Sequence, residues 1–156
     1  TIAATLGADM PFCLTGGLAY GTGFGERITD IAPGSRDELA LIEQGFSGEV
    51  LVGAYQSQLS TPEVYHTFDI VGAAEGDRNH LQAAAITLPS RSGSHRRRHA
   101  GGASHAFVSG SGPSVVAFAA DEAAANGIIE VWRDTAVVDR IIRAKSPEHP
   151  NISVRQ

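Results

Sequence analysis

Residues 6–13 read Leu6-Gly7-Ala8-Asp9-Met10-Pro11-Phe12-Cys13, and no other stretch of the chain says more about its structure. A proline restricts the residue before it and favours the end of a helix. We therefore expect a helix over residues 1–8 that stops at Asp9, followed by a short apolar segment over residues 11–15. An acid held on a turn beside apolar residues can act as a general base or a metal ligand, although most acids at helix ends have no chemical role.

The composition is that of an ordinary globular protein. The chain has 156 residues, of which 42% are hydrophobic and 19% charged, and this length suits one domain or two small ones. The formal net charge of −5 argues against a nucleic-acid partner. No apolar run approaches the roughly 20 residues that cross a bilayer, and the first residues lack the basic start of a signal peptide. We therefore expect no membrane partner.

Cysteine usage indicates a reducing compartment. Cys13 is the only cysteine, so an internal disulfide is impossible. Its neighbours Phe12 and Leu14 suggest that the thiol packs as a small buried hydrophobe. We expect a cytoplasmic protein.

The remaining pattern predicts a mixture of strands and helices. Strands are expected over residues 14–20, 26–31, 48–55, 106–108, 115–119 and 136–144, and helices over residues 63–70, 78–88 and 121–133. The first two strands form a hairpin with a glycine-rich bend. Residues 33–43 form a connection, and the tail from Ser146 is loose or adds an edge strand at residues 152–154. Because the elements follow no strict βαβ rhythm, we expect an α+β fold with an antiparallel sheet.

The segment Ser60-Thr61-Pro62-Glu63 predicts the start of a helix, with a hydroxyl to cap the free amides and a proline near the first helical position. The simplest role of Thr61 is this cap. Tyr65 lies one turn later on the same side of the helix. Its ring can face a ligand or simply pack.

The segment Ser109-Gly110-Ser111-Gly112-Pro113 joins two expected strands. Its glycines permit a positive φ, and successive free amides in such a turn form a concave site for an anion. A phosphate contact is therefore one interpretation. A tight turn between strands, for which Gly-Ser-Gly is common, is the other.

Two further patterns carry less weight. Residues 21–25 have the spacing of a dinucleotide fingerprint, but a hairpin surrounds them and we assign them to its turn. The spacing of His95, His99 and His105 permits zinc, yet no Cys or carboxylate completes a familiar pattern. We interpret the histidines and the adjacent run of three arginines over residues 96–98 as a solvated basic loop, and expect no metal site.

Several motifs together carry a resemblance. They are Leu6-Gly7-Ala8-Asp9-Met10-Pro11-Phe12-Cys13-Leu14, Gly16-Gly17, Gly21-Thr22-Gly23, Gly25-Glu26, Leu59-Ser60-Thr61-Pro62-Glu63-Val64-Tyr65, Asn79-His80-Leu81-Gln82-Ala83-Ala84 and Val108-Ser109-Gly110-Ser111-Gly112-Pro113. In this order they resemble the 4-diphosphocytidyl-2-C-methyl-D-erythritol kinases, a family of the GHMP superfamily that acts in non-mevalonate isoprenoid biosynthesis. The resemblance covers residues 6–144 and is to the C-terminal part of those enzymes.

The resemblance implies a GHMP-kinase-like α+β fold in two parts. Residues 1–45 would be the remnant of an S5-like N-terminal domain, and residues 46–156 a shortened ferredoxin-like C-terminal domain. The implied reaction transfers the γ-phosphate of ATP, with Mg²⁺, to the 2-hydroxyl of a cytidylyl sugar alcohol phosphate.

The family motifs also imply roles for individual residues. Asp9 would be the catalytic base, Thr61 and Tyr65 would line the substrate pocket, and Ser109, Gly110, Ser111 and Gly112 would bind phosphate.

The sequence also departs from the family. No Gly/Ser-rich phosphate loop precedes Asp9, and the only lysine, Lys145, lies in a late strand. We therefore expect the chain alone to have no measurable kinase activity. The alternatives are a non-catalytic module that binds cytidine nucleotides or another phosphorylated metabolite, a degenerate product, or a homoserine or mevalonate type of kinase. Apolar residues on the first helix and its neighbour, Ile2, Leu6, Phe12 and Leu14, would be exposed and favour a homo-oligomer.

Overall fold

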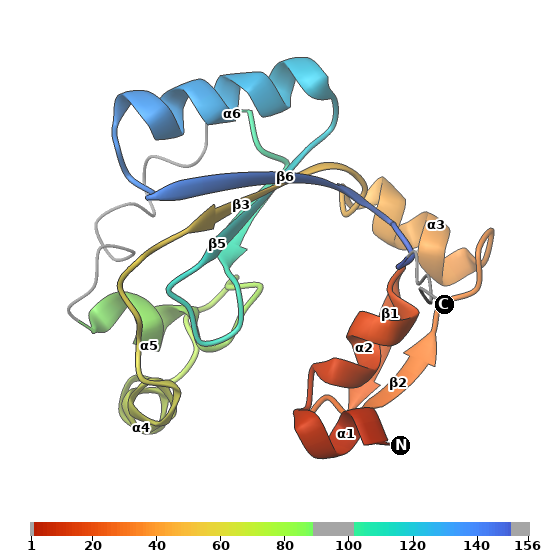
Figure 1. Cartoon of the computed structure of the whole chain (residues 1–156), viewed down its shortest axis with the longest axis horizontal. Coiled ribbons are helices and arrows are strands. Elements are labelled where there is room, and N and C mark those ends of the chain that lie inside the picture. The colour runs from red at the N-terminus through yellow and green to blue at the C-terminus, as the bar shows by residue number, and fades with distance from the viewer. Residues whose placement is uncertain (1, 89–101, 151–156) are drawn as a thin grey trace, which may run out of the picture. The chain divides into compact units, whose positions relative to one another are not determined.

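The computed structural model describes residues 2–88 and 102–150, which fall into two compact units (Figure 1). The first unit holds the described residues up to Gln44 and those from Lys145 onward, and the second runs from Gly45 to Ala144. The described helices are α1 (Ile2–Leu6), α2 (Met10–Thr15), α3 (Arg36–Glu43), α4 (Thr61–Val71), α5 (Gln82–Thr87) and α6 (Glu122–Asp134). The described strands are β1 (Ala19–Thr22), β2 (Arg27–Asp30), β3 (Gly48–Ala54), β4 (His105–Val108), β5 (Val115–Ala119) and β6 (Arg140–Ser146). This mixture confirms the α+β class, whereas the assignment of residues 1–45 and 46–156 to two kinase domains stays a prediction.

The first unit opens with two short helices. A helix ends before Asp9 as predicted, but residues 11–15 belong to a second helix, α2, which the sequence pattern did not predict. Asp9 is the N-cap of α2 and Pro11 lies in its first turn. Proline is tolerated there because the first helical N–H groups have no partner within the helix. The predicted burial of Cys13 is wrong, since this residue of α2 is exposed.

A hairpin of β1 and β2 follows. The strands are antiparallel, with Ala19 opposite Asp30 and Thr22 opposite Arg27. The glycine run at residues 21–25 lies at the hairpin end, as predicted, and the N–H of Phe24 donates to the Glu26 carboxylate at 2.7 Å. The first strand starts later than expected because residues up to Thr15 are helical.

The expected connection over residues 33–43 is instead mostly helix α3. The Ser35 hydroxyl accepts a hydrogen bond from the N–H of Glu38, and the Glu38 carboxylate accepts one from the N–H of Gly34. This reciprocal pair resembles a capping box, which satisfies the free amides at the start of a helix. The polar composition of the segment concealed that signal.

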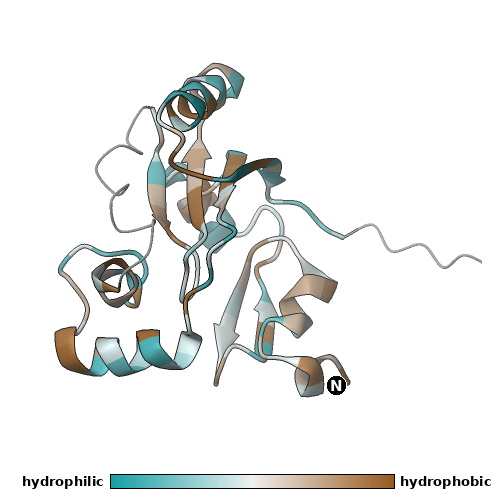
Figure 2. Cartoon of the chain, turned by 60° about the vertical axis from the view of Figure 1, so that its left-hand side comes forward, coloured by the Kyte–Doolittle hydropathy of each residue, from teal (hydrophilic) through white to brown (hydrophobic). Residues whose placement is uncertain are grey.

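The second unit contains a four-stranded sheet in the order β4-β5-β3-β6. β5 is antiparallel to both β4 and β3, with Val115 opposite Val108 and Ala117 opposite Leu51. Helix α6 lies over one face of this sheet (Figure 1). Seen nearly end-on, it carries hydrophobic and hydrophilic residues on different sides (Figure 2). Its Asp121 cap accepts a hydrogen bond from the N–H of Ala124, as the predicted helix start requires.

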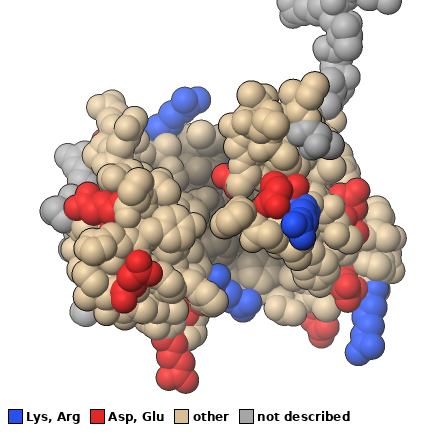
Figure 3. Space-filling view, turned by 90° about the horizontal axis from the view of Figure 1, so that it is seen from below, with Lys and Arg blue, Asp and Glu red and all other residues tan. Residues whose placement is uncertain are grey.

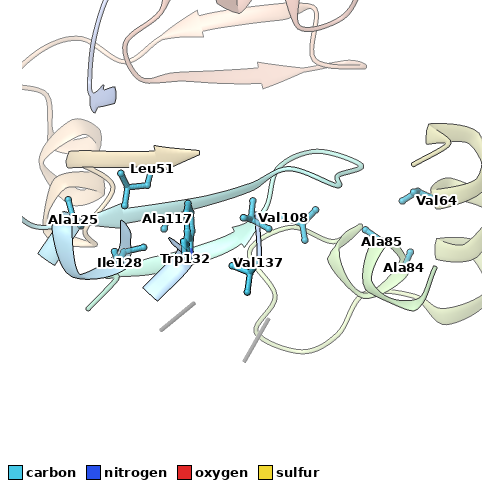
Figure 4. Close-up of a cluster of buried hydrophobic side chains, with 12 residues drawn as sticks. Leu51, Val64, Ala84, Ala85, Val108, Ala117, Ala125, Ile128, Trp132 and Val137 are labelled. Atoms are coloured by element: carbon cyan, nitrogen blue, oxygen red, sulfur yellow. The ribbon is translucent and has the colours of Figure 1, made fainter. Parts of the chain in front are cut away.

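The hydrophobic core of the second unit joins the sheet, α6 and the α4–α5 pair. Its largest fully buried side chains are Trp132, Leu51, Ile128, Val64 and Val137. Figure 4 shows Val108 between the group around Trp132 and the group formed by Val64, Ala84 and Ala85. Through this strand residue the two helices α4 and α5 are packed next to the end of β4.

Some predicted boundaries in this unit change. Helix α4 is longer than residues 63–70, and α5 is shorter than residues 78–88. The last strand begins at Arg140 rather than at residue 136, and Val137 is buried in the connection that precedes it. The predicted basic loop with His95, His99 and residues 96–98, and the possible edge strand at 152–154, lie outside the described residues.

Candidate functional site

The turn between β4 and β5 consists of Ser109, Gly110, Ser111 and Gly112, here called the glycine loop. The N–H of Ser109 donates to the Ser114 carbonyl at 2.8 Å, and the N–H of Gly112 donates to the Ser109 carbonyl at 2.9 Å. Gly110 and Gly112 have φ values of 57° and 78°, which glycine adopts without steric cost. Within the described residues, the N–H groups of Gly110 and Ser111 donate no hydrogen bond. Two adjacent amides are therefore available to an anion.

Helix α4 reaches this loop through one side chain. The Thr61 hydroxyl lies 2.9 Å from the Ser111 hydroxyl, within hydrogen-bond distance. The predicted capping role of Thr61 is wrong, because Ser60 occupies the N-cap position and makes no side-chain cap hydrogen bond. The structure thus brings together one predicted substrate residue and one predicted phosphate residue that are 50 positions apart in the sequence.

Tyr65 follows Thr61 by one helical turn. Val64, beside it, is fully buried and anchors α4 in the core, whereas Tyr65 is 54% exposed. Its ring is therefore accessible to a ligand. The described ranges contain no hydrogen bond between Tyr65 and the glycine loop.

Asp9 belongs to the first unit, and Thr61, Tyr65 and the glycine loop belong to the second. Asp9 is exposed at the N-terminus of α2, and its side chain makes no capping hydrogen bond. Its backbone carbonyl accepts a hydrogen bond from the N–H of Cys13 at 3.3 Å, which fixes the turn. The backbone of Asp9 is therefore fixed by the start of α2, while its exposed carboxylate makes no capping bond to the helix.

The glycine loop is held by two amide side chains that the sequence analysis did not single out as site residues. Asn79 donates from Nδ2 to the carbonyls of Val108 and Gly110, each at 2.7 Å. The Gln82 Oε1 accepts a hydrogen bond from the N–H of Val108 at 3.0 Å. Their signal in the sequence was the Asn-His-Leu-Gln segment itself, whose polar residues precede an alanine-rich helix.

Among the described residues no group of three His, Cys, Asp or Glu side chains could hold a metal ion. His105 stacks its ring on Phe46 with centroids 4.3 Å apart. No helix within residues 2–88 and 102–150 is long and apolar enough to cross a bilayer. On the face shown in Figure 3, Lys and Arg are scattered among Asp and Glu and form no basic patch.

Comparison with known proteins relates these features to a family. Residues 96–138 match the family model described as GHMP kinases C terminal. A Bifidobacterium longum protein named 4-diphosphocytidyl-2-C-methyl-D-erythritol kinase is 91% identical over 157 residues, which cover 100% of this chain and 50% of the relative. A Bifidobacterium adolescentis protein of the same name is 54% identical, over 98% of this chain and 50% of the relative.

A solved structure supports the fold. The crystal structure of a 4-(cytidine 5'-diphospho)-2C-methyl-D-erythritol kinase matches with a TM-score of 0.68 at 24% identity, over 91% of this chain and 54% of the other. The chain therefore spans about half the length of the relatives that it matches.

Proposed function

Because this chain belongs to the 4-diphosphocytidyl-2-C-methyl-D-erythritol kinase family of GHMP kinases, we propose that it takes part in the ATP-dependent phosphorylation of the 2-hydroxyl of that cytidylyl substrate. The observation that carries this proposal is the 2.9 Å contact between Thr61 and Ser111. It joins a helix suited to bind substrate to a loop suited to bind phosphate. We place the reaction in the cytoplasm, in keeping with a single cysteine.

The glycine loop fits a phosphate group. Its free amides at Gly110 and Ser111 and the Ser111 hydroxyl would donate to phosphate oxygens of ATP. Charge stabilisation of this kind is a main source of rate in phosphoryl transfer. Because the described residues offer no three-carboxylate cage, Mg²⁺ would arrive with the ATP phosphates, as it commonly does, and would neutralise their charge.

Asp9 would act as the base. Its carboxylate accepts the proton of the substrate 2-hydroxyl while that oxygen bonds to the γ-phosphorus. The bond from the γ-phosphorus to the bridging oxygen breaks, and ADP leaves with the electron pair. A carboxylate that makes no capping hydrogen bond is suited to this step, since its lone pairs face no competing helix amides.

Thr61 and Tyr65 would bind the substrate. The exposed ring of Tyr65 offers a flat apolar surface on which a cytosine could stack, and the Thr61 hydroxyl would orient a polar group next to the glycine loop. Their spacing of one helical turn places both on the same side of α4.

A kinase assay tests the proposal. The eight residues before Asp9 contain no Gly/Ser-rich loop, so we expect the purified 156-residue chain to form no measurable ADP. We expect substrate-dependent ADP formation when the chain is joined to the half of the Bifidobacterium longum relative that it does not cover. In that hybrid, Asp9→Asn should lower kcat by about 10²-fold or more. Asp30→Asn, the same change at an exposed residue of the same unit, should leave it unchanged.

Three results would contradict these statements. Robust phosphorylation by the 156-residue chain alone would refute the predicted inactivity. An Asp9→Asn hybrid with normal kcat would refute the role of Asp9. A folded hybrid without any kinase activity would refute the assigned reaction.

A second candidate is a binding module without catalysis. It is favoured by the fact that Thr61, Tyr65 and the glycine loop all lie in the second unit, without Asp9. Calorimetry with cytidine diphosphate tests it. We expect binding that Thr61→Val weakens and that Thr67→Val, on the same helix, does not. No heat at millimolar ligand would count against a working pocket.

A further inference from the structure

The glycine loop follows the end of an edge strand. The outward backbone groups at that end are hydrogen-bonded by side chains instead of by another strand. β4 is the outermost strand of the sheet. The outward N–H of its last residue, Val108, is bound by Gln82, and the outward carbonyl by Asn79. The two amide side chains therefore act as a substitute for a neighbouring strand at the point where the loop begins.

Asn79 also reaches into the loop. Its second Nδ2 hydrogen bond goes to the carbonyl of Gly110 at 2.7 Å, and its Oδ1 accepts from the N–H of Leu81 at 3.0 Å. Both donors and the acceptor of the amide are thus in use. Since two carbonyls need the donor end and one N–H needs the acceptor end, the orientation of the amide group is fixed.

The hydrogen bond to Gly110 controls where the loop amide points. The peptide between Gly110 and Ser111 is trans, so its carbonyl and its N–H point in opposite directions. With the carbonyl held by Asn79, the N–H of Ser111 must face away from Asn79. This is one of the two amides that no described residue uses.

Gln82 is linked to Asn79 through the backbone, since its N–H donates to the Asn79 carbonyl at 2.9 Å. It is a buried polar residue, 6% exposed, and its Nε2 donates to the Asp77 carboxylate at 2.7 Å while its Oε1 accepts from Val108. A buried amide with both ends satisfied resists rotation, because any other orientation would leave polar atoms unpaired. The Gln82 side chain therefore fixes Val108 at the end of β4, directly before the glycine loop.

We propose that Asn79 is a positioning residue: by binding the Val108 and Gly110 carbonyls, it aims the N–H of Ser111 outward at the phosphate of a bound nucleotide. The proposal rests on the proposed function of the glycine loop. It adds a residue that itself touches no ligand but determines whether the loop can bind one.

Asn79→Asp is the sharpest test, because it keeps the size of the side chain and replaces the donor with a carboxylate oxygen facing two carbonyls. ATP affinity of the 156-residue chain, followed by the shift of the Ser111 amide in NMR spectra, should fall about tenfold or more. Cytidine diphosphate affinity should change less than twofold, which general unfolding would not allow. Asn126→Asp adds the same charge at an exposed position of α6 and should change neither affinity.

A measurement without ligand separates this proposal from the proposed function. The N–H of Gly112, bonded to Ser109 inside the loop, should exchange with solvent about tenfold faster in Asn79→Asp than in the unaltered chain. If the unaltered chain binds no ATP, the proposed phosphate-binding role of the glycine loop fails for this chain, and the exchange rate still tests the position of the loop. Unchanged exchange together with unchanged ATP affinity overturns the role of Asn79. Should Asn79→Asp not fold, Asn79→Ser takes its place: it adds no charge, and its single hydroxyl hydrogen can serve at most one of the two carbonyls, so it should show the same two effects.

Discussion

Replacing Gly53 with alanine should destabilise the second unit. Gly53 is the last residue but one of β3, and a Cβ placed on it would lie 2.7 Å from Val138 Cγ1, 2.9 Å from Val115 Cγ2 and 3.1 Å from Trp132 Cζ3. Two of these distances are shorter than carbon atoms tolerate, and Trp132 and Val115 are buried and cannot swing into solvent. Overpacking of this kind costs about 1–3 kcal/mol. The lower chain entropy of alanine in the unfolded state offsets about 0.5–1 kcal/mol of that.

The net expectation is a loss of about 1–2 kcal/mol, a large share of the stability of a small domain. Urea unfolding followed by fluorescence measures it directly, because Trp132 is the only tryptophan and is buried in this unit. Gly127→Ala provides the matched control, since a Cβ on this residue of α6 meets no atom within 4 Å. Alanine favours a helix over glycine, so that variant should be stabilised by about 0.5–1 kcal/mol.

Opposite signs for the two glycine variants are the essential result. Val138→Ala in the Gly53→Ala background should recover part of the loss, because it removes the methyl group that lies nearest to the added Cβ. A Gly53→Ala protein as stable as the unaltered chain would refute the packing described around Trp132. If Gly53→Ala lowers the stability and Val138→Ala does not restore any of it, the strain does not come from the contact with Val138.

The remaining predictions concern a partly buried tyrosine and an exposed apolar face. Burial, with a smaller contribution from Asp139, raises the pKa of Tyr55 from its ordinary value near 10 to about 12. Because the unfolded chain releases this proton first, stability should fall between pH 10 and about 12, and Tyr55→Phe should lack that fall in pH-dependent unfolding. Ile2, Leu6 and Leu14 are 82%, 72% and 55% exposed, so the 156-residue chain should associate in gel filtration, and Leu6→Glu with Leu14→Glu should shift it toward a monomer. A monodisperse monomer without these changes would contradict the second expectation.

The sequence was most informative where hydrophobic periodicity and a capping residue agreed. Helix α6 begins after Asp121 as predicted, and the apolar run at residues 115–119 forms strand β5 with the predicted bounds. The residue pattern also placed the glycine loop between two strands, where the structure has it. Local signals sufficed there because the packing partner of each element is in the same unit.

Elements were missed where two local rules competed. Pro11 was interpreted as the end of a helix, yet proline can equally stand in the first turn of the next one. The polar segment that precedes Leu39 conceals the pair Ser35 and Glu38, whose hydrogen bonds start α3. Only the backbone geometry decides between such alternatives.

The sequence motifs nominated the residues of the candidate site, but not the hydrogen bonds between them. Nothing in the sequence indicates that Thr61 contacts Ser111 instead of capping its own helix. Asn79 was visible as part of a motif, but its hydrogen bonds to Val108 and Gly110 depend on how α5 packs beside β4. Such tertiary contacts between distant segments have no local signature.

Strand β6 belongs to both units, because residues 140–144 lie in the second and Lys145 and Ser146 in the first. In sequence, the second unit is therefore an insertion within the first. Its two ends meet, since Arg143 near the end of β6 binds Glu49 near the start of β3 at 2.7 Å. A segment whose two ends are adjacent can be expressed on its own, or its ends can be joined, without breaking the chain inside it. Residues 45–144 are therefore a unit on which nucleotide binding could be studied separately.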